Sequence, residues 1–285
     1  INRSTLRNEE YPFKVDVSIV KSSHRKGKYP IPEYKFKDAD VLNSSPQYEI
    51  EIEIDNNKVG PGTAYNTPES LNLALKKVIK FVLSGLQSTN YPISYPEQEE
   101  IKSSYMKILW GDKEQRKIFP RNFVGPSSFT LQMVNIAPVN ENMNIPNIRN
   151  NYCVTEKADG ERKLLYISNK GKLYLIDTNM NIQFTGSITQ QKESFNTIID
   201  GEHILLDKKG NWINVYAAFD LYYIQGIDKR ALPFAFDPNN ETKEKLDSSN
   251  FRLPLLASMI KKIQPQSVIK TEKISPIIIK PKRFI

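Results

Sequence analysis

The stretch Lys157-Ala158-Asp159-Gly160-Glu161-Arg162 decides how the second half of this 285-residue chain is interpreted. Apolar and polar residues alternate before it, over residues 152–156, and the apolar run Leu164-Leu165-Tyr166-Ile167 follows it. This pattern predicts a strand, a tight turn that contains glycine, and a second strand. A lysine at such a turn, five residues before an arginine, is a candidate nucleophile toward a nucleotide phosphate. The alternative is a hairpin whose tip is merely charged.

The overall composition is that of an ordinary soluble protein, because 39% of the residues are hydrophobic and 25% are charged. A net charge of +8 favours a polyanionic partner such as nucleic acid or a nucleotide, although a basic surface without such a partner explains the charge equally well. A single cysteine, Cys153, excludes an internal disulfide framework and a cysteine-based zinc site, and two distant histidines, His24 and His203, do not make a metal cluster. No apolar run reaches the roughly 20 residues that span a membrane, so we expect no membrane partner and a reducing intracellular compartment.

Residues 1–55 are predicted to form β-strands. From Phe13 to Lys21 apolar and polar residues alternate, which is typical of a half-buried antiparallel strand. A second alternating stretch places four carboxylates on one face, at Glu49, Glu51, Glu53 and Asp55. Neighbours in this row are separated by about 6.5–7 Å and repel one another unless water, basic groups or a cation compensates them. The row is therefore either the solvated face of an edge strand or a site for Mg²⁺ or Mn²⁺.

The remainder of the chain is predicted to contain helices and further strands. An amphipathic helix with a Thr-Pro start is predicted over residues 67–87, and other helices over 96–109 and 250–263. Residues 111–150 are rich in Asn, Pro, Lys and Ser, and we interpret them as a connection between domains. Residues 151–220 are predicted to return to β-strands joined by glycine-containing turns.

Three short strings follow one another on the predicted strands of the second half: Lys157-x-Asp159-Gly160-x-Arg162, Asp200-Gly201-Glu202 and Tyr216-x-Ala218-Phe219-Asp220. In this order they resemble the covalent nucleotidyltransferases, the superfamily of mRNA capping guanylyltransferases and polynucleotide ligases. The resemblance implies that Lys157 attacks the α-phosphate of a nucleoside triphosphate, forms a lysyl-N–NMP phosphoramidate and releases pyrophosphate. It also implies that Arg162 and Asp159 contribute to nucleotide binding, with Arg162 near the ribose. Glu202 would contact the ribose or a metal ion, and Phe219 would stack on the base.

These implied roles agree with elementary chemistry. An ordinary lysine, with a pKa of about 10.4, is protonated at neutral pH, and burial or neighbouring positive charge lowers such a value. A bound Mg²⁺ would neutralise the triphosphate and stabilise the leaving pyrophosphate. An aromatic ring such as Phe219 supplies stacking, so the identity of the base must be read by hydrogen bonds elsewhere.

The two strands of the first part resemble the later strands of the metal-dependent triphosphate tunnel enzymes. Those enzymes hydrolyse the γ-phosphate of 5′-triphosphate RNA inside a β-barrel lined by acidic and basic residues. The resemblance places Glu49, Glu51 and Glu53 on the family's C-terminal glutamate motif and implies that two of the three hold Mg²⁺ or Mn²⁺. It implies that charged side chains line the tunnel, namely Arg3, Lys14, Asp16 and Lys21.

A triphosphate tunnel followed by a guanylyltransferase is the arrangement of capping enzymes from large cytoplasmic DNA viruses and from cytoplasmic linear plasmids of yeast. The fold class expected is α+β. Residues 1–110 are expected to be the C-terminal part of an antiparallel β tunnel or barrel, and residues 151–285 the N-terminal part of a nucleotidyltransferase domain of antiparallel sheets with flanking helices. The expected substrates are 5′-triphosphate RNA and GTP, and the resemblance implies a cytoplasmic location, in a viral factory or virion or in a plasmid-bearing host. We also expect further domains in the same polypeptide: upstream tunnel strands and downstream OB-type and methyltransferase domains.

Two departures from these family patterns limit the expectation. No E-x-E strand precedes Lys14, and no D-G-[LI]-[IV] string or suitably placed K-x-K string follows Asp220, since Lys280-Pro281-Lys282 lies in another context. We therefore expect this chain alone to be incomplete for both activities. An ATP- or NAD-dependent ligase would explain the second half but not the glutamate row, and a non-catalytic RNA-binding module would explain only the charge.

Overall fold

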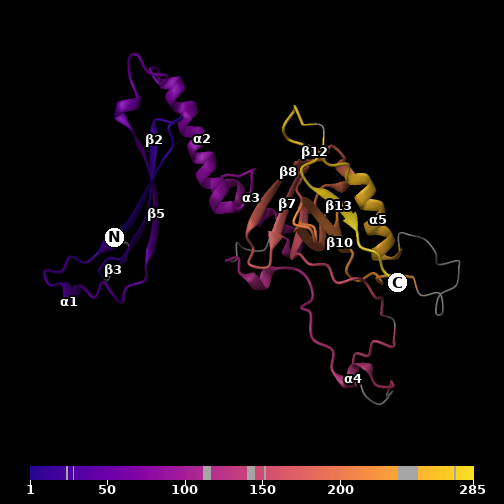
Figure 1. The fold of residues 1–285 in the computed structure, drawn as a ribbon. Coiled ribbons are helices and arrows are strands. Elements are labelled where there is room, and N and C mark those ends of the chain that lie inside the picture. The colour runs from indigo at the N-terminus through magenta and orange to yellow at the C-terminus, as the bar shows by residue number, and fades with distance from the viewer. Residues whose placement is uncertain are drawn as a thin grey trace. The chain divides into compact units, whose positions relative to one another are not determined.

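The computed structural model of the chain describes residues 1–23, 25–27, 29–111, 117–139, 145–150, 152–236, 250–272 and 274–285. His24 and parts of the predicted connection lie outside these ranges. The chain forms two compact units, Ile1–Leu86 and Gln87–Ile285, and each is described by itself (Figure 1). None of the described helices is long and apolar enough to cross a membrane.

The first unit is built on a three-stranded antiparallel sheet in the order β1-β2-β5. Its elements are β1 (Asn2–Arg7), β2 (Phe13–Val20), β3 (Arg25–Lys26), β4 (Tyr29–Pro30), α1 (Phe36–Ala39), β5 (Gln47–Ile54), the 3₁₀ helix η1 (Asn56–Lys58) and α2 (Pro68–Gln87). The predicted start of α2 is confirmed, because the Thr67 hydroxyl accepts a hydrogen bond of 3.2 Å from the Ser70 backbone N–H.

The predicted strand at β2 is confirmed, but its expected pattern of burial holds only at one end, because farther along the polar residues Asp16 and Ser18 are 3% and 0% exposed. Phe13 is 5% exposed and packs with Ala74 and Val78 of α2. Val17 and Ile19, farther along the same face, are 38% and 42% exposed. The described residues of this unit therefore form an open sheet with one covering helix, and the closed tunnel remains a prediction.

The second unit is built on an eight-stranded sheet. Seven strands are ordered β11-β10-β9-β6-β7-β8-β12 and antiparallel, while β13 pairs with β10 in parallel. The strands are β6 (Glu161–Ile167), β7 (Lys172–Asp177), β8 (Ile182–Ile188), β9 (Thr197–Leu206), β10 (Trp212–Ile224), β11 (Ile227–Asp228), β12 (Gln266–Ser267) and β13 (Ile278–Pro281). The helices are α3 (Tyr95–Trp110), α4 (Met133–Ile136) and α5 (Arg252–Ile263), with short 3₁₀ turns η2 (Pro120–Asn122) and η3 (Lys192–Ser194). The predicted α+β class is confirmed.

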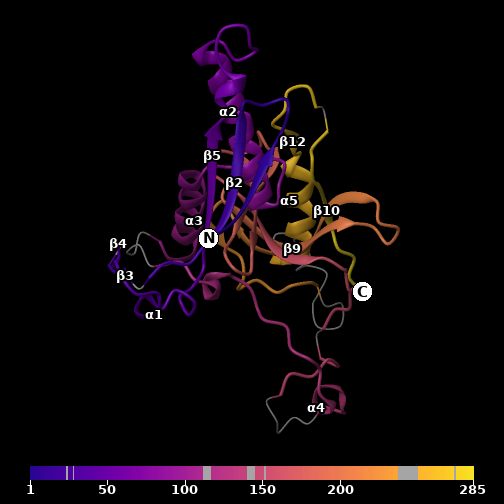
Figure 2. The ribbon, with the colours of Figure 1, turned by 60° about the vertical axis from the view of Figure 1, so that its left-hand side comes forward.

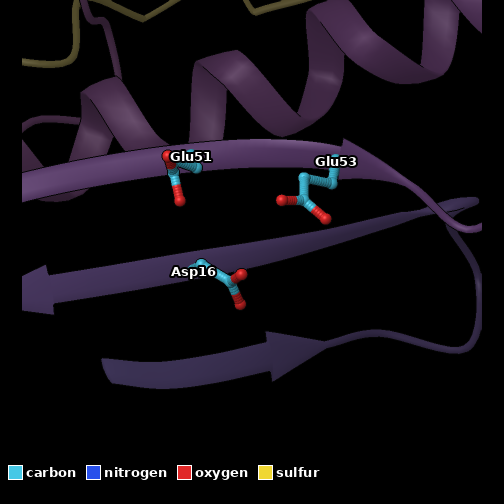
Figure 3. A group of neighbouring side chains, drawn as sticks. All are labelled: Asp16, Glu51 and Glu53. Carbon is cyan, nitrogen blue, oxygen red and sulfur yellow. The ribbon is translucent and has the colours of Figure 1, made fainter. Parts of the chain in front are cut away.

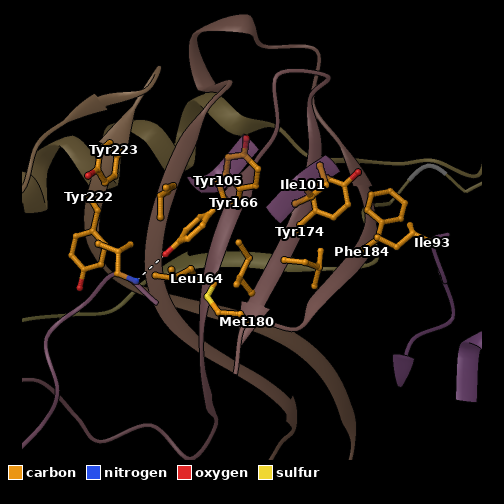
Figure 4. Packing of buried hydrophobic residues seen from close by; sticks show 14 residues of the cluster. Ile93, Ile101, Tyr105, Leu164, Tyr166, Tyr174, Met180, Phe184, Tyr222 and Tyr223 are labelled. Atoms are coloured by element: carbon orange, nitrogen blue, oxygen red, sulfur yellow. Dashed lines mark hydrogen bonds between the residues drawn. The ribbon is translucent and has the colours of Figure 1, made fainter. Parts of the chain in front are cut away.

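Both faces of this sheet are buried, which explains the unbroken apolar run at residues 164–167. Successive residues of a strand point to opposite faces. Leu164 packs into a cluster with Tyr105 of α3 (Figure 4), and Leu165 packs into a second cluster with Leu256 of α5. All four side chains are completely buried. The two layers of helix hold β6 and β9, which carry the candidate site, in the middle of the sheet.

Helix α3 packs with the strands of the second unit. The chain divides between Leu86 and Gln87, so α3, which we had placed in the region 1–110, belongs to the same compact unit as the second-half strands. Its Ile101 and Tyr105 are buried in the core beside β6. The functional assignment of the two regions remains a prediction.

The predicted hairpin at Lys157 is wrong in its first arm. Residues 152–156 do not pair with β6. Instead Thr155 forms an isolated antiparallel bridge with Phe284, and Val154 and Ile285 exchange two backbone hydrogen bonds of 2.9 Å. The backbone groups of this extended segment are thus satisfied by a distant part of the chain. β6, which begins at Glu161, pairs with β7 and β9.

Candidate active site

The three sequence strings of the second half meet on neighbouring strands. Arg162 of β6 lies directly opposite Glu202 of β9, and Glu202 lies opposite Ala217 of β10. Phe219 follows at a register shift between Ala218 and Asp220. Side chains of directly opposed residues lie on the same face of a sheet, about 4.5–5.5 Å apart at Cβ. The structure therefore brings Arg162, Glu202 and the Phe219 strand together.

Arg162 is held by a buried carboxylate that the sequence analysis did not assign to the site. Its Nε and Nη2 donate to the two carboxylate oxygens of Asp200 over 3.2 and 2.6 Å, and Asp200 has no exposed side-chain surface. The Tyr222 hydroxyl donates a further hydrogen bond of 2.6 Å to Asp200. Burial raises the pKa of Asp200, against the opposing effect of Arg162 and Tyr222, and the hydrogen bond to Asp200 raises the pKa of Arg162. A paired, doubly hydrogen-bonded guanidinium has a fixed orientation.

A loop from the predicted connection closes over this pair. The Pro126 carbonyl accepts a hydrogen bond of 2.6 Å from Arg162 Nη1, and the Phe123 ring lies 5.4 Å from the Arg162 guanidinium carbon. Gly125 has φ +151°, and a Cβ there would lie 2.5 Å from Arg162 Nη2. Only glycine fits this approach without displacing the guanidinium. The composition of residues 111–150 gave no signal for this role, apart from an isolated glycine.

The buried hydroxyl of Tyr105 anchors the same loop. It accepts a hydrogen bond of 2.8 Å from the Val124 N–H and donates one of 2.9 Å to the Asn122 carbonyl. Burial raises the pKa of Tyr105 far above neutral, so the hydroxyl remains protonated and able to donate. Helix α3 therefore fixes the loop that fixes Arg162.

Phe219 is half-buried and has two cations near its ring. The Arg162 guanidinium carbon lies 5.9 Å and the Lys282 ammonium 5.8 Å from the ring centroid. The parallel pairing of β13 with β10 places Lys282 here, and its backbone N–H donates a hydrogen bond of 2.7 Å to the Ala218 carbonyl. The string Lys280-Pro281-Lys282, which we had set aside, thus contributes a residue to the site. Cations near an aromatic face are attracted by its quadrupole.

Glu202 has a buried oxygen without a partner. Its Oε2 is shielded from solvent and accepts no hydrogen bond among the described residues. A buried carboxylate oxygen without a donor is unfavourable, and such groups in native proteins call for an explanation. A ligand hydroxyl that donates a hydrogen bond, or a divalent cation that the oxygen coordinates, would satisfy it.

Lys157 and Asp159 are exposed and lie on the loop between the Thr155 bridge and β6. Among the described residues neither side chain forms a hydrogen bond or an ion pair. The loop is nevertheless placed by its glycine, because a Cβ on Gly160 would lie 2.8 Å from the His203 carbonyl and 2.9 Å from a side-chain carbon of Ile204. The chain three residues after Lys157 is therefore packed against β9 at His203 and Ile204, next to Glu202.

The first unit contains a separate carboxylate cluster. One carboxylate oxygen each from Asp16, Glu51 and Glu53 lies within 4.8 Å of the others, and Figure 3 shows the three on β2 and β5. Asp16 is 3% exposed and accepts a hydrogen bond of 2.6 Å from the Thr5 hydroxyl. Carboxylates so grouped match the oxygen ligands that Mg²⁺ and Mn²⁺ take.

Basic side chains from the same sheet compensate this cluster. Arg3 pairs with Glu51 at 2.8 Å and with Asp16 at 3.3 Å, and Lys14 pairs with Glu53 at 2.6 Å. These contacts join the predicted tunnel residues to the predicted metal ligands.

Two predicted members lie apart from the cluster. Glu49 is opposite Ser18 and is outside the group of three, among the described residues. Lys21 donates a hydrogen bond of 2.7 Å to the Leu42 carbonyl. The grouping thus includes two of the three predicted glutamates, together with Asp16, which we had assigned to the tunnel lining.

Comparison with known proteins places this geometry in context. The sequence model described as "mRNA capping enzyme, catalytic domain" matches residues 121–273. A protein named "Probable mRNA-capping enzyme", from Acanthamoeba polyphaga mimivirus, is 30% identical over 190 residues, which make up 67% of this chain. The match covers only 14% of the mimivirus protein. The range 121–273 contains the Phe123–Pro126 loop, Arg162, Asp200, Glu202 and Phe219.

Proposed function

This chain belongs to the family of mRNA capping enzymes, and we propose that its second unit transfers GMP from GTP to the 5′ end of RNA through Lys157. The observation that carries the proposal is the meeting of Arg162, Glu202 and Phe219 on adjacent strands, beside the loop of Lys157. A positioned cation, an unpaired acceptor and an aromatic ring are the groups that a nucleotide requires.

The proposed reaction has two displacement steps. The neutral amine of Lys157 attacks the α-phosphorus of GTP, a nitrogen–phosphorus bond forms, and the bond to the bridging oxygen breaks to release pyrophosphate. In the second step a terminal oxygen of diphosphate-ended RNA attacks the same phosphorus and the bond to Lys157 breaks. A divalent cation, when bound, would neutralise charge on the triphosphate. Exposure of Lys157 keeps the amine accessible to both substrates.

The nucleotide would be held by the groups around Phe219. A base stacked on this ring would lie beside Lys282 and Arg162, which donate hydrogen bonds and accept none. Guanine presents two acceptors, O6 and N7, on one edge, which fits such a surface. The unpaired Oε2 of Glu202 would accept a hydrogen bond from a ribose hydroxyl.

We propose that the first unit contributes to RNA 5′-triphosphatase activity. Asp16, Glu51 and Glu53 would hold Mg²⁺ or Mn²⁺, which would supply charge neutralisation for the triphosphate. Arg3 and Lys14, released from their carboxylate partners, would bind phosphate oxygens. The grouping of the three carboxylates supports this role.

The proposal for the second unit is tested by covalent labelling. The chain is incubated with Mg²⁺ and either [α-³²P]GTP or [α-³²P]ATP, and protein-bound label is measured after denaturation. We expect label from GTP that disappears in Lys157→Ala, and incomplete onward transfer to RNA. Label from ATP alone would replace the proposal by the ligase alternative. Labelling of Lys157→Ala equal to that of the wild type would overturn it.

A further inference from the structure

The turn between β9 and β10 has a fixed shape. The Asp207 carboxylate accepts hydrogen bonds from the backbone N–H groups of Lys209 and Asn211 over 2.8 and 2.9 Å, and from the Asn211 side chain over 2.9 Å. The only acidic side chain of the turn is thus hydrogen-bonded within it. Lys208 and Lys209 are both exposed. The tip of this hairpin therefore presents positive charge in a defined geometry.

Next to the lysines lies an exposed apolar pair. Trp212 is directly opposite Leu206, and the two side chains are 64% and 52% exposed. No element of the described chain covers this tryptophan fully, and Figure 2 shows the hairpin, in orange, projecting from the sheet. A large exposed ring beside cations is the combination that binds single-stranded nucleic acid, through stacking and phosphate contacts.

The hairpin is continuous with the candidate active site. Along β9, residues at intervals of two share one face, so Leu206 and its partner Trp212 lie on the face of Glu202. The distance along the strand from residue 202 to residue 206 is about 13 Å. Between them, Ile204 lies beneath Gly160, at the base of the loop that carries Lys157. Pairing of β6 with β9 ends at His203, and beyond it Leu205 and Leu206 of β9 are exposed.

We propose that this hairpin binds the first nucleotides of the acceptor RNA, with a base stacked on Trp212 and phosphates contacted by Lys208 and Lys209. This inference rests on the proposed function, since it names the surface that would direct RNA to the Lys157 adduct. RNA fits better than a protein partner because the charge at the tip is positive and the apolar area is one ring with one leucine, not a broad patch.

The first test measures RNA binding in the absence of GTP. Its result does not depend on GMP transfer, so the inference can hold even if the proposed transfer fails. Fluorescence anisotropy of a short, 3′-labelled single-stranded RNA with a 5′-diphosphate reports the Kd. We expect Trp212→Ala to weaken binding about ten-fold and Trp212→Phe to retain most of it, since stacking on one aromatic ring carries about that much affinity. Trp110→Ala, at the other tryptophan, is the matched control. Equal loss in Trp110→Ala, or wild-type affinity in Trp212→Ala, would overturn the inference.

The second test separates the phosphate contacts. The double variant Lys208→Ala/Lys209→Ala is expected to lower the slope of log K against log salt by about 1.4, because each phosphate contact to a single strand contributes about 0.7. The control removes two adjacent exposed lysines of α5, Lys261 and Lys262. An unchanged slope in the first variant, or the same change in both, would contradict the proposal.

A spectroscopic test uses the Trp110→Phe variant, in which Trp212 is the only tryptophan. Stacking of a base on Trp212 is expected to quench its fluorescence as RNA is added, with a midpoint equal to the Kd from anisotropy. Binding of RNA without any change in this signal would place the contact elsewhere and overturn the inference. A change of Trp212 fluorescence on addition of another protein, with no change on addition of RNA, would also overturn the inference.

Discussion

The Arg162–Asp200 pair of the second unit and the Arg3–Glu51 pair of the first unit are both ion pairs, but they differ in burial. Asp200 has no exposed side-chain surface and Arg162 has 27%, whereas Arg3 and Glu51 have 40% and 46%. An exposed pair contributes little to stability, whereas the loss of one partner of a buried pair leaves an uncompensated charge. We infer that Arg162 of the second unit is held in place before a ligand binds, whereas Arg3 of the first unit can exchange its carboxylate partner for a ligand.

The largest effect is expected from removing Asp200. Asp200→Ala leaves Arg162 and the Tyr222 hydroxyl without their buried partner, and breaking a buried pair in this way costs about 3–5 kcal/mol. We expect the free energy of unfolding, measured by urea denaturation of the second-unit signal, to fall by about that amount. The matched change in the first unit, Glu51→Ala, is expected to cost less than about 1 kcal/mol. Similar losses in both variants would remove the basis of the comparison.

A strong effect on activity is expected at Gly125. A Cβ there would lie 2.5 Å from Arg162 Nη2, so Gly125→Ala must displace the guanidinium or the loop. We expect GMP labelling from GTP to fall by at least ten-fold, since one misplaced cation is worth roughly 10²-fold in a reaction that depends on positioning. Gly226→Ala is the control, because it has φ +74° and open space around its Cβ position. Equal labelling in the two variants would show that Arg162 does not need its fixed position.

An intermediate effect is expected in the first unit. Glu51→Gln and Glu53→Gln each remove a charge from the carboxylate cluster and should weaken Mn²⁺ binding about ten-fold, since ligand charge tunes such affinities. Glu49→Gln, on the same strand but outside the cluster, should leave Mn²⁺ binding near that of the wild type. Isothermal titration calorimetry measures the three Kd values. Equal weakening by all three changes would support a diffuse acidic face instead of a site.

The smallest effect is a pH dependence of stability from His203. Burial lowers the pKa of this histidine, whose Nε2–H donates a hydrogen bond of 2.7 Å to the Asn214 amide oxygen. Below the ordinary value of about 6.5 the unfolded chain binds a proton that the folded chain does not, so stability decreases as the pH falls from 6.5 toward the lowered pKa. We expect His203→Gln to remove this decrease and His24→Gln, at the other histidine, to retain it. Urea denaturation at a series of pH values provides the measurement.

Local alternation made some of the fold predictable. Alternating apolar and polar residues predict the strand that begins at Phe13, and a continuous apolar run predicts the strand at Leu164, which is buried on both faces. Both patterns arise because successive side chains of a strand point to opposite faces of the sheet. Which strands pair with one another was harder to predict from the sequence. Residues 152–156 have strand character, but they pair with residues near Phe284, more than a hundred positions away.

The candidate site likewise contains residues that local sequence patterns identify and residues that they do not. Arg162, Glu202 and Phe219 were found because each lies in a short string with a recognisable chemistry. Asp200 and Lys282 were not assigned because their roles come from contacts made across strands, although an aspartate directly after Ile198 and Ile199 was a signal of a buried charge. Gly125 had no signal except its residue type. Contacts between distant segments create the site, and a single sequence does not contain them.

The central claim is that Lys157 carries GMP, and peptide mass spectrometry tests it most directly. The chain is incubated with GTP and Mg²⁺ at neutral pH, the adduct is kept at alkaline pH, and the peptides are mapped. The account predicts a GMP adduct on the peptide that contains Lys157, greatly reduced in Asp200→Ala, and no adduct from ATP. An adduct on another lysine, or an AMP adduct in place of GMP, would contradict it.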